Sequence, residues 1–195
     1  LYEEWFVRLR FPGHEHVRIK NGVPEGWERV PFEDALVLQR GFDLPARLRK
    51  KGEIPIYAST GVTGWHNEAK VKGPGIVTGR SGSLGMVSYA PSDFWPLNTA
   101  LWVREFRRVA PLFAYFMLQK MRLEQYNGGA SVPTLDRNAV HRVNVTVPSR
   151  QLLGLFDEYA KPAFLQKTLL EAQNGKFAAA RDHLLPKLMS GEIAA

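Results

Sequence analysis

The segment GPGIVTGRSGSLGMVSY, residues 73–89, places glycines, serines and one arginine between two short apolar runs. A glycine-rich loop can surround a phosphate with backbone N–H groups, so a nucleotide-using enzyme is the first function to consider. A Walker loop has the pattern G-x-x-x-x-G-K-S/T, and no Lys-Ser or Lys-Thr pair follows these glycines. A dinucleotide loop needs G-x-G-x-x-G before a helix. Here Ser81 occupies the second glycine position, and the following MVSYA has the composition of a strand.

The same segment fits a β-hairpin, because a strand, a glycine turn and a second strand follow one another. Its turn would present Arg80, Ser81 and Ser83 to solvent. Guanidinium and hydroxyl groups on a rigid turn suit phosphate oxygens or base edges. Turn serines can instead bond to their own backbone, and the sequence leaves both interpretations open.

A second glycine segment, NGGASVPTLDRNAVHRVNVTVP, covers residues 127–148. Gly128 and Gly129 relax the backbone after a predicted helix, and Asp136 is positioned to cap a short turn of helix. Arg137 could reach a phosphate or pair with Asp136, and both alternatives stay open.

Side chains with catalytic or metal-binding chemistry are scattered. His14 and His16 lack a third ligand at helical spacing, so we expect no metal site. His66, His141 and His183 are isolated and are expected to be surface or core histidines. There is no G-x-S-x-G elbow, no H-E-x-x-H motif and no Asn-Pro-Pro-Tyr type tetrapeptide of the amino-group DNA methyltransferases. We therefore expect neither catalytic residues nor a cofactor.

The positive charge of the chain is concentrated in its middle. The 195 residues carry a formal net charge of +7, and residues 40–80 hold eight Lys or Arg against three Asp or Glu. The densest part, QRGFDLPARLRKKGE, contains Arg40, Arg47, Arg49, Lys50 and Lys51. A clustered basic surface suggests a polyanionic partner, most often nucleic acid. The alternative is a solvated loop that happens to be basic.

The composition also limits the compartment. With 45% apolar residues the chain can bury a core, and without cysteine it has no disulfide and no thiolate metal site. No apolar run approaches the roughly 18 residues that span a bilayer. We predict a cytoplasmic protein with no membrane partner.

The body of the chain is predicted to be mostly β. The runs IPIYA, GIVTG, GMVSYA, ALWVREF and VNVTVP are separated by turn residues and predict strands. APLFAYFMLQKMRLEQY predicts one helix that ends at NGG. Trp65, Trp95 and Trp102 are expected to pack in the core or against hairpins. LYEEWFVRLRFPG is similar to the last turns of an amphipathic helix ended by Pro12 and Gly13.

Residues from 149 onward predict a long helix with a heptad seam, because apolar residues alternate at steps of four and three. The seam consists of Leu152, Phe156, Tyr159, Ala163, Gln166, Leu170, Gln173, Phe177, Ala180 and Leu184. Such a stripe favours pairing with a second helix as a coiled coil. The alternative is packing on the chain's own body. Ser149 is predicted to cap the helix, Pro162 to kink it or begin a new helix, and Pro186 and Gly191 to mark its end.

Five ordered segments carry a family resemblance. They are GVPEGWERVPFEDALVLQRG, EIPIYASTGVTGWHNE, GIVTGRSGSLGMVSYAPSDFWPLNTALWV, YNGGASVPTLDRNAVHRVNVTVP and FAAARDHLLPKLMSGEI. Together they resemble the DNA-specificity (S) subunit of Type I restriction–modification enzymes over almost the whole chain. The resemblance implies an α+β fold: a mostly β target-recognition domain with one or more helices (residues 24–148), then a long C-terminal helix that pairs as a coiled coil (149–195). Residues 1–23 would be the end of a preceding helix and a connector.

The resemblance also implies a non-catalytic protein that binds double-stranded DNA and directs methyltransferase (modification) subunits, with a restriction subunit in the larger complex. It would be the second half of a full subunit or a half-length version that dimerises through its long helix. The basic residues of 40–51 would hold phosphates. The candidates for base reading are Ser59, Thr60, Thr63, Arg80, Ser81 and Ser83. Two other functions stay open: a coiled-coil assembly scaffold whose β domain binds protein, and a nucleotide-using enzyme built around the glycine turn.

Overall fold

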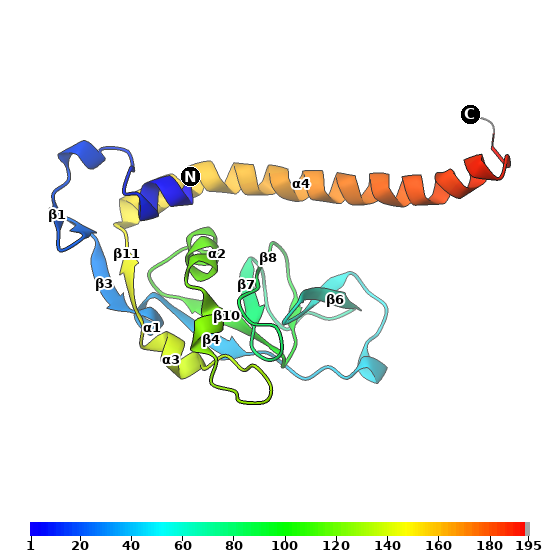
Figure 1. The fold of residues 1–195 in the computed structure, drawn as a ribbon, viewed down its shortest axis with the longest axis horizontal. Helices are drawn as coiled ribbons and strands as arrows, with labels where there is room; N and C mark the ends of the chain where they lie inside the picture. Colours follow the sequence, from blue (N-terminus) through cyan, green and yellow to red (C-terminus); the bar gives the residue numbers. More distant parts are fainter. Residues whose placement is uncertain (194–195) are drawn as a thin grey trace. The chain divides into compact units, whose positions relative to one another are not determined.

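The computed structural model describes residues 1–193 and divides the chain into two compact units, Leu1–Asp157 and Glu158–Ala195 (Figure 1). The strands are β1 (Ile19–Lys20), β2 (Val23–Pro24), β3 (Glu28–Pro31), β4 (Leu36–Arg40), β5 (Ile54–Ala58), β6 (Gly61–His66), β7 (Gly75–Gly79), β8 (Val87–Ala90), β9 (Trp95–Pro96), β10 (Ala100–Phe106) and β11 (Asn144–Val147). The helices are η1 (Glu3–Val7), η2 (His14–His16), α1 (Phe32–Ala35), η3 (Ala46–Leu48), α2 (Pro111–Lys120), η4 (Leu123–Tyr126), α3 (Arg137–His141) and α4 (Arg150–Met189). The predicted α+β class, a mostly β domain and a long C-terminal helix, is confirmed.

The first unit is built from small sheets. The largest has the order β4-β10-β7-β8, with all its pairs antiparallel. A second sheet has the order β6-β5-β9, in which β5 and β9 run parallel. β11 pairs with β3, and β1 with β2. The five predicted strands are present, while β3, β4 and β6 were not anticipated as strands.

The core joins the two larger sheets. Tyr57 of β5 packs with Val77 of β7 and with Phe94, which is fully buried. Helix α2 contacts β7 and β8, and its residues Leu112 and Leu118 are also buried. Because every residue of β7 is buried, this strand is the fixed base from which the glycine turn projects.

The predicted hairpin is confirmed as β7 and β8, which pair antiparallel from Gly75 opposite Ala90 to Thr78 opposite Val87. Thr78 is 2% exposed, and its Oγ1 donates a hydrogen bond of 2.8 Å to the carbonyl oxygen of Met86. A buried hydroxyl needs such a partner, so this bond stabilises the base of the turn.

Two predicted helix boundaries are wrong. Helix α2 ends at Lys120, and after Arg122, whose φ is +48°, the chain continues as the short 3-10 helix η4. This break turns Leu123 into the core, where it is fully buried. The N-terminal piece is helical only over Glu3–Val7 and ends before Pro12. Its aromatic residues pack on the domain. Phe6, for example, lies 4.9 Å from Phe113 and 5.1 Å from Phe156 between ring centroids.

Helix α4 is a single element of 40 residues. The predicted cap is confirmed, because the main-chain N–H of Leu152 donates to Oγ of Ser149 (3.3 Å). No new helix begins at Pro162, and Pro186 lies inside the helix rather than at its end. The helix ends at Met189, and Gly191 in the following turn has a φ of +74°. A proline removes one backbone donor but does not stop a helix whose other hydrogen bonds are intact.

Candidate nucleic-acid interface

The two glycine segments lie against each other. Ser81 forms an isolated β-bridge with Thr134, and the main-chain N–H of Leu135 donates to the carbonyl oxygen of Arg80 (2.8 Å). On its other side the turn is tied to the loop before β10, because the N–H groups of Arg80 and Ser81 both donate to the carbonyl oxygen of Thr99 (2.9 and 3.1 Å). Backbone bonds to two separate segments therefore hold the turn in place.

The turn leaves its hydroxyl groups available. Within residues 1–193 neither Ser81 nor Ser83 uses its hydroxyl in an internal hydrogen bond, and Ser83 is exposed. The interpretation in which these serines satisfy their own backbone is therefore wrong for their side chains. Hydroxyl groups on a fixed, exposed turn can donate to or accept from a partner.

Three arginines from separate elements line one cavity of about 290 Å³. Arg40 ends β4, Arg80 follows β7, and Arg137 begins α3. The lining is completed by Leu101, Leu135, Asp136 and Asn138. We call this the arginine cavity. It brings together three predicted site residues that lie up to 97 positions apart in the sequence, and it adds Asn138, which sequence reasoning missed although it follows Arg137 directly.

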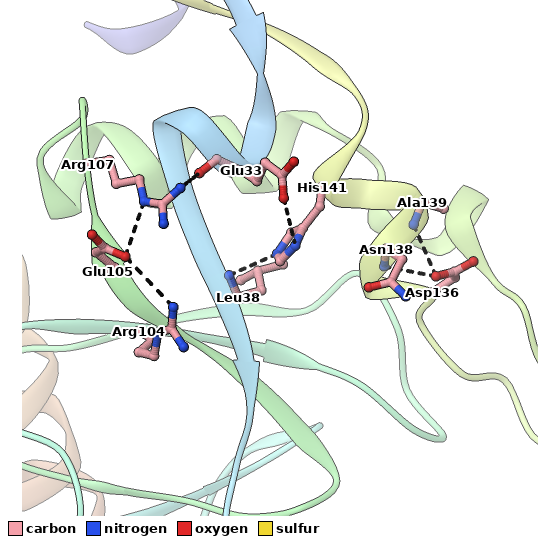
Figure 2. Close-up of polar contacts among 9 residues, drawn as sticks. All are labelled: Glu33, Leu38, Arg104, Glu105, Arg107, Asp136, Asn138, Ala139 and His141. Atoms are coloured by element: carbon pink, nitrogen blue, oxygen red, sulfur yellow. Dashed lines mark hydrogen bonds and ion pairs between the residues drawn. The ribbon is translucent and has the colours of Figure 1, made fainter.

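The predicted cap of α3 is confirmed. The Oδ1 atom of Asp136 accepts hydrogen bonds from the main-chain N–H groups of Asn138 (2.9 Å) and Ala139 (3.1 Å), as Figure 2 shows. A cap of this kind contributes about 1 kcal/mol to helix stability. It fixes the start of α3, and with it the backbone of Arg137.

His141 attaches α3 to the main sheet (Figure 2). Its Nε2 accepts a hydrogen bond from the main-chain N–H of Leu38 in β4 (3.1 Å), and its ring stacks on Phe32 at 5.9 Å between centroids. Glu33 lies 4.0 Å from Nδ1. The histidine is therefore a structural residue that sets α3, and thus Arg137, against the strand that carries Arg40.

Burial lowers the pKa of His141, and the charge of Arg137 lowers it further, with smaller contributions from Arg107 and Arg104. Glu33 acts in the opposite direction. The neutral ring is thus favoured in the folded state, which agrees with its role as acceptor from Leu38. Figure 2 shows how Arg107 is held: it donates to the carbonyl oxygen of Glu33 (2.9 Å).

The free energy of unfolding is expected to decrease as the pH falls below about 6.5, the ordinary pKa of histidine. The unfolded chain takes up the proton more readily than the folded one, so the contribution of His141 is present above this pH and is lost as the pH falls through the lowered pKa. His141→Gln keeps an acceptor near the position of Nε2 but does not titrate. Urea unfolding of both proteins between about pH 7.5 and pH 5 should show a shallower pH dependence in the variant. Equal dependences would contradict the assignment.

The predicted basic cluster is divided between two places. Arg40 lines the arginine cavity, whereas Arg47, Arg49, Lys50 and Lys51 do not. The latter group lies on and after η3, with all but Arg49 exposed. The main-chain N–H of Lys50 donates to Nδ1 of the buried His66 (3.0 Å), which ties this stretch to β6. We call residues 46–51 the basic segment.

The candidates in ASTGVTGWH are not loop residues as a group. Ser59 is only 9% exposed, so the prediction that its side chain reads bases from a surface loop is wrong. Thr60 is exposed in the turn between β5 and β6, and Thr63 lies within β6. Trp65 of β6 is 57% exposed, which contradicts its assignment as a packing residue, while Trp95 is buried as expected.

The predicted helix-pairing residues fall into two groups. Leu152 and Phe156 are buried in the first unit at 7% and 0% exposure, so they form part of the domain core. The remaining seam members, Tyr159, Ala163, Gln166, Leu170, Gln173, Phe177, Ala180 and Leu184, are exposed. The later seam members, from Ala163 to Leu184, are therefore exposed side chains of α4.

Over residues 1–193 no three His, Cys, Asp or Glu side chains are grouped so that they could hold a metal ion. None of the helices in that range is long and apolar enough to cross a membrane.

Known proteins resemble this chain in sequence family and in fold. Residues 24–151 match the model of a family described as the Type I restriction modification DNA specificity domain. No curated protein matches the chain. The fold is similar to that of the Type I restriction–modification S subunit from M. genitalium, with a TM-score of 0.63 and 17% identity, covering 91% of this chain and 49% of the other. It is also similar to the HsdS subunit from Thermoanaerobacter tengcongensis, with a TM-score of 0.53 and 12% identity over 92% and 49% of the two chains.

A third similar structure, with a TM-score of 0.58 and 12% identity, comes from a study of complex assembly and conformational transition of the type I R-M system. The match covers 87% of this chain and 46% of the chain in that structure. The chain thus spans about half the length of the solved structures that it matches.

Proposed function

Because the chain belongs to the family of Type I restriction modification DNA specificity domains, we propose that it recognises a specific sequence of double-stranded DNA and directs catalytic subunits to it, without catalysis of its own. The arginine cavity is the observation that carries this proposal. It is lined by three arginines and lies beside a turn whose hydroxyl groups are available. Guanidinium groups bind phosphate oxygens and base acceptors, and hydroxyl groups bind either.

The proposed division of labour follows from exposure and charge. Arg47, Lys50 and Lys51 of the basic segment are exposed and would contact phosphates, which fixes the protein on the duplex without reading sequence. Bases would be read in the major groove, where each base pair has a distinct pattern of donors and acceptors. Ser83 and Thr60 are the predicted readers that the structure leaves on exposed turns.

The exposed seam of α4 supports a proposal about assembly. Helix α4 would pair through the seam from Tyr159 to Leu184 with a second helix of the same kind, in a second specificity half or in another copy of this chain. The partners would be the modification subunits, which supply methyl transfer, and a restriction subunit. The study of type I R-M assembly behind one similar structure fits this proposal.

A second candidate function rests on the same seam. The chain could be an assembly scaffold in which α4 holds subunits together and the β domain binds protein. The arginine cavity and the basic segment favour DNA, because a protein partner would not require this concentration of cations.

Salt dependence of duplex binding tests the proposed function. A protein that neutralises Z phosphates releases their counterions, so the logarithm of its binding constant falls with the logarithm of the salt concentration with a slope of about −0.9Z. A duplex-binding protein therefore loses affinity steeply as the salt concentration rises. Fluorescence anisotropy with a labelled duplex, on the chain together with its modification subunits, measures this slope. A scaffold would show no such slope, and a nucleotide-using enzyme would bind a mononucleotide alone.

Neutralising the basic segment is expected to flatten that slope. The triple variant Arg47→Gln, Lys50→Gln and Lys51→Gln removes up to three phosphate contacts, and each contact contributes about 0.9 to the slope. A matched control removes the same charge from the N-terminal part of the chain, through Arg18→Gln, Lys20→Gln and Arg29→Gln, all at exposed positions. An equal change of slope in both triple variants would remove the basic segment from the interface.

A further inference from the structure

We propose that the arginine cavity binds one backbone phosphate of the target duplex, and so sets the register of the domain on the DNA without reading any base. This inference rests on the proposed function, since it assigns a role to one part of the DNA-binding surface. Sequence reasoning had placed Arg80 among the candidates for base reading, whereas the cavity assigns it to the backbone together with Arg40 and Arg137.

The charge of the cavity fits an anion. Arg40, Arg80 and Arg137 contribute three positive charges, and Asp136 is the single carboxylate in the lining. That carboxylate is already engaged with two main-chain N–H groups of α3. Arg137 forms no ion pair within the described part of the chain, and Arg40 has only a long contact of 3.9 Å to Asp43. The site therefore keeps a net positive charge that a phosphodiester would balance.

The shape of the site favours a phosphate over a base. Base edges lie on the floor of the major groove, about 8.5 Å deep, so a side chain that reads them must project from the protein. The three arginines instead line an open cavity, which can receive a group that projects from the DNA. In a duplex the projecting groups are the phosphates of the backbone.

The backbone at each of the three arginines is also held in advance of binding. Arg40 pairs with Leu101 in the antiparallel ladder of β4 and β10. Arg80 is fixed by backbone bonds on both sides, and its Nη1 donates to the carbonyl oxygen of Asn98 (3.2 Å), which leaves its other N–H donors for a ligand. Arg137 follows the capped start of α3. Planar guanidinium groups carried by a fixed backbone can bind phosphate oxygens in a bidentate manner.

A free phosphate carries the same chemistry, so the test must separate the two sources. The proposed ligand is the phosphodiester of a duplex, because an isolated phosphate lacks the further contacts that the rest of the DNA backbone would make with the domain. Inorganic phosphate, titrated at constant ionic strength into the complex with its modification subunits, should displace the duplex only at concentrations far above those of the duplex.

The decisive experiment combines a variant with a modified backbone. The complex, which contains either the wild-type chain or the Arg137→Gln variant, is titrated with a series of duplexes. Each duplex carries one neutral methylphosphonate, placed at a different backbone position of one strand. Arg137→Gln is expected to weaken binding of both the preferred and a scrambled duplex by roughly the same factor, about tenfold. At one backbone position the methylphosphonate should weaken the wild type but not the variant, because both changes remove the same contact.

The double variant Arg80→Gln and Arg137→Gln sharpens the test. Since both side chains share one phosphate, the salt slope should change by about 0.9 and not by twice that value. The single variant Arg137→Lys keeps the positive charge, so its salt slope should equal that of the wild type. Its affinity for the duplex should stay below that of the wild type. Thermal melting confirms that each variant is folded.

Several results would overturn the inference: coupling at no phosphate position, a loss confined to the preferred duplex, or tight binding of inorganic phosphate with duplex binding unaffected by Arg137→Gln. Failure of the proposed function looks different, because the wild-type complex would then bind no duplex selectively.

Discussion

Replacing Leu170 with aspartate is expected to disrupt the proposed pairing of α4 with a second helix. Leu170 is 50% exposed and lies on the seam between Gln166 and Gln173, so it is the one large apolar seam residue between Tyr159 and Phe177. Those two aromatic residues are about 27 Å apart along the helix at 1.5 Å per residue. A carboxylate buried in the helix–helix interface would cost on the order of 3 kcal/mol or more, which weakens pairing at least about 100-fold.

Sedimentation equilibrium of the chain measures this effect as a change of mass. Leu165→Asp is the matched control, since Leu165 is an exposed leucine of the same helix that lies off the seam. The control should keep the mass of the wild type, and Leu170→Asp should give the mass of a single chain. If the wild type is itself a single chain at every attainable concentration, or if both variants behave alike, the seam does not pair copies of this chain.

Replacing Gly79 with alanine is expected to destabilise the hairpin and displace the turn that carries Arg80. A Cβ on Gly79 would overlap the carbonyl oxygen of Ser83 and lie 3.2 Å from that of Ser59, and both are backbone atoms. Backbone cannot rotate away as a side chain can, so we expect a loss of about 2–4 kcal/mol in the free energy of unfolding. DNA affinity should fall as well, because the turn forms part of the arginine cavity.

Gly154→Ala provides a control of opposite sign. A Cβ on Gly154 meets nothing within 4 Å, and alanine favours a helix over glycine by about 1 kcal/mol. Urea unfolding should therefore show this variant to be as stable as the wild type or more stable. A Gly79→Ala protein of wild-type stability would mean that the turn is not packed as described.

Local features could be predicted from the sequence because a few neighbouring residues determine them. The strands around Ile56, Val77 and Val145 follow from β-branched and apolar runs between turn residues. The caps at Ser149 and Asp136 follow from the preference of short polar side chains for the first position of a helix. The β7–β8 hairpin follows from glycines between two strand-like runs.

The site could not be predicted in the same way, because contacts distant in the sequence create it. Strand β10 lies between β4 and β7 and pairs antiparallel with both, so Arg40 at the end of β4 and Arg80 after β7 lie at the same edge of the sheet. The His141–Leu38 bond attaches α3, which begins with Arg137, to β4. Strand β6 contains two glycines, which weaken the strand pattern, and its pairing with β5 overrides that preference. Because these glycines weaken the strand pattern, Ser59 was expected in a surface loop, whereas the structure buries it.

The central claim is that this domain reads the sequence of a DNA duplex. Selection from a pool of random duplexes by the chain assembled with its modification subunits, followed by sequencing of the retained DNA, tests it most directly. We predict that one short motif becomes enriched round after round. A pool that stays random, although the complex is assembled and retains duplex, would contradict the claim.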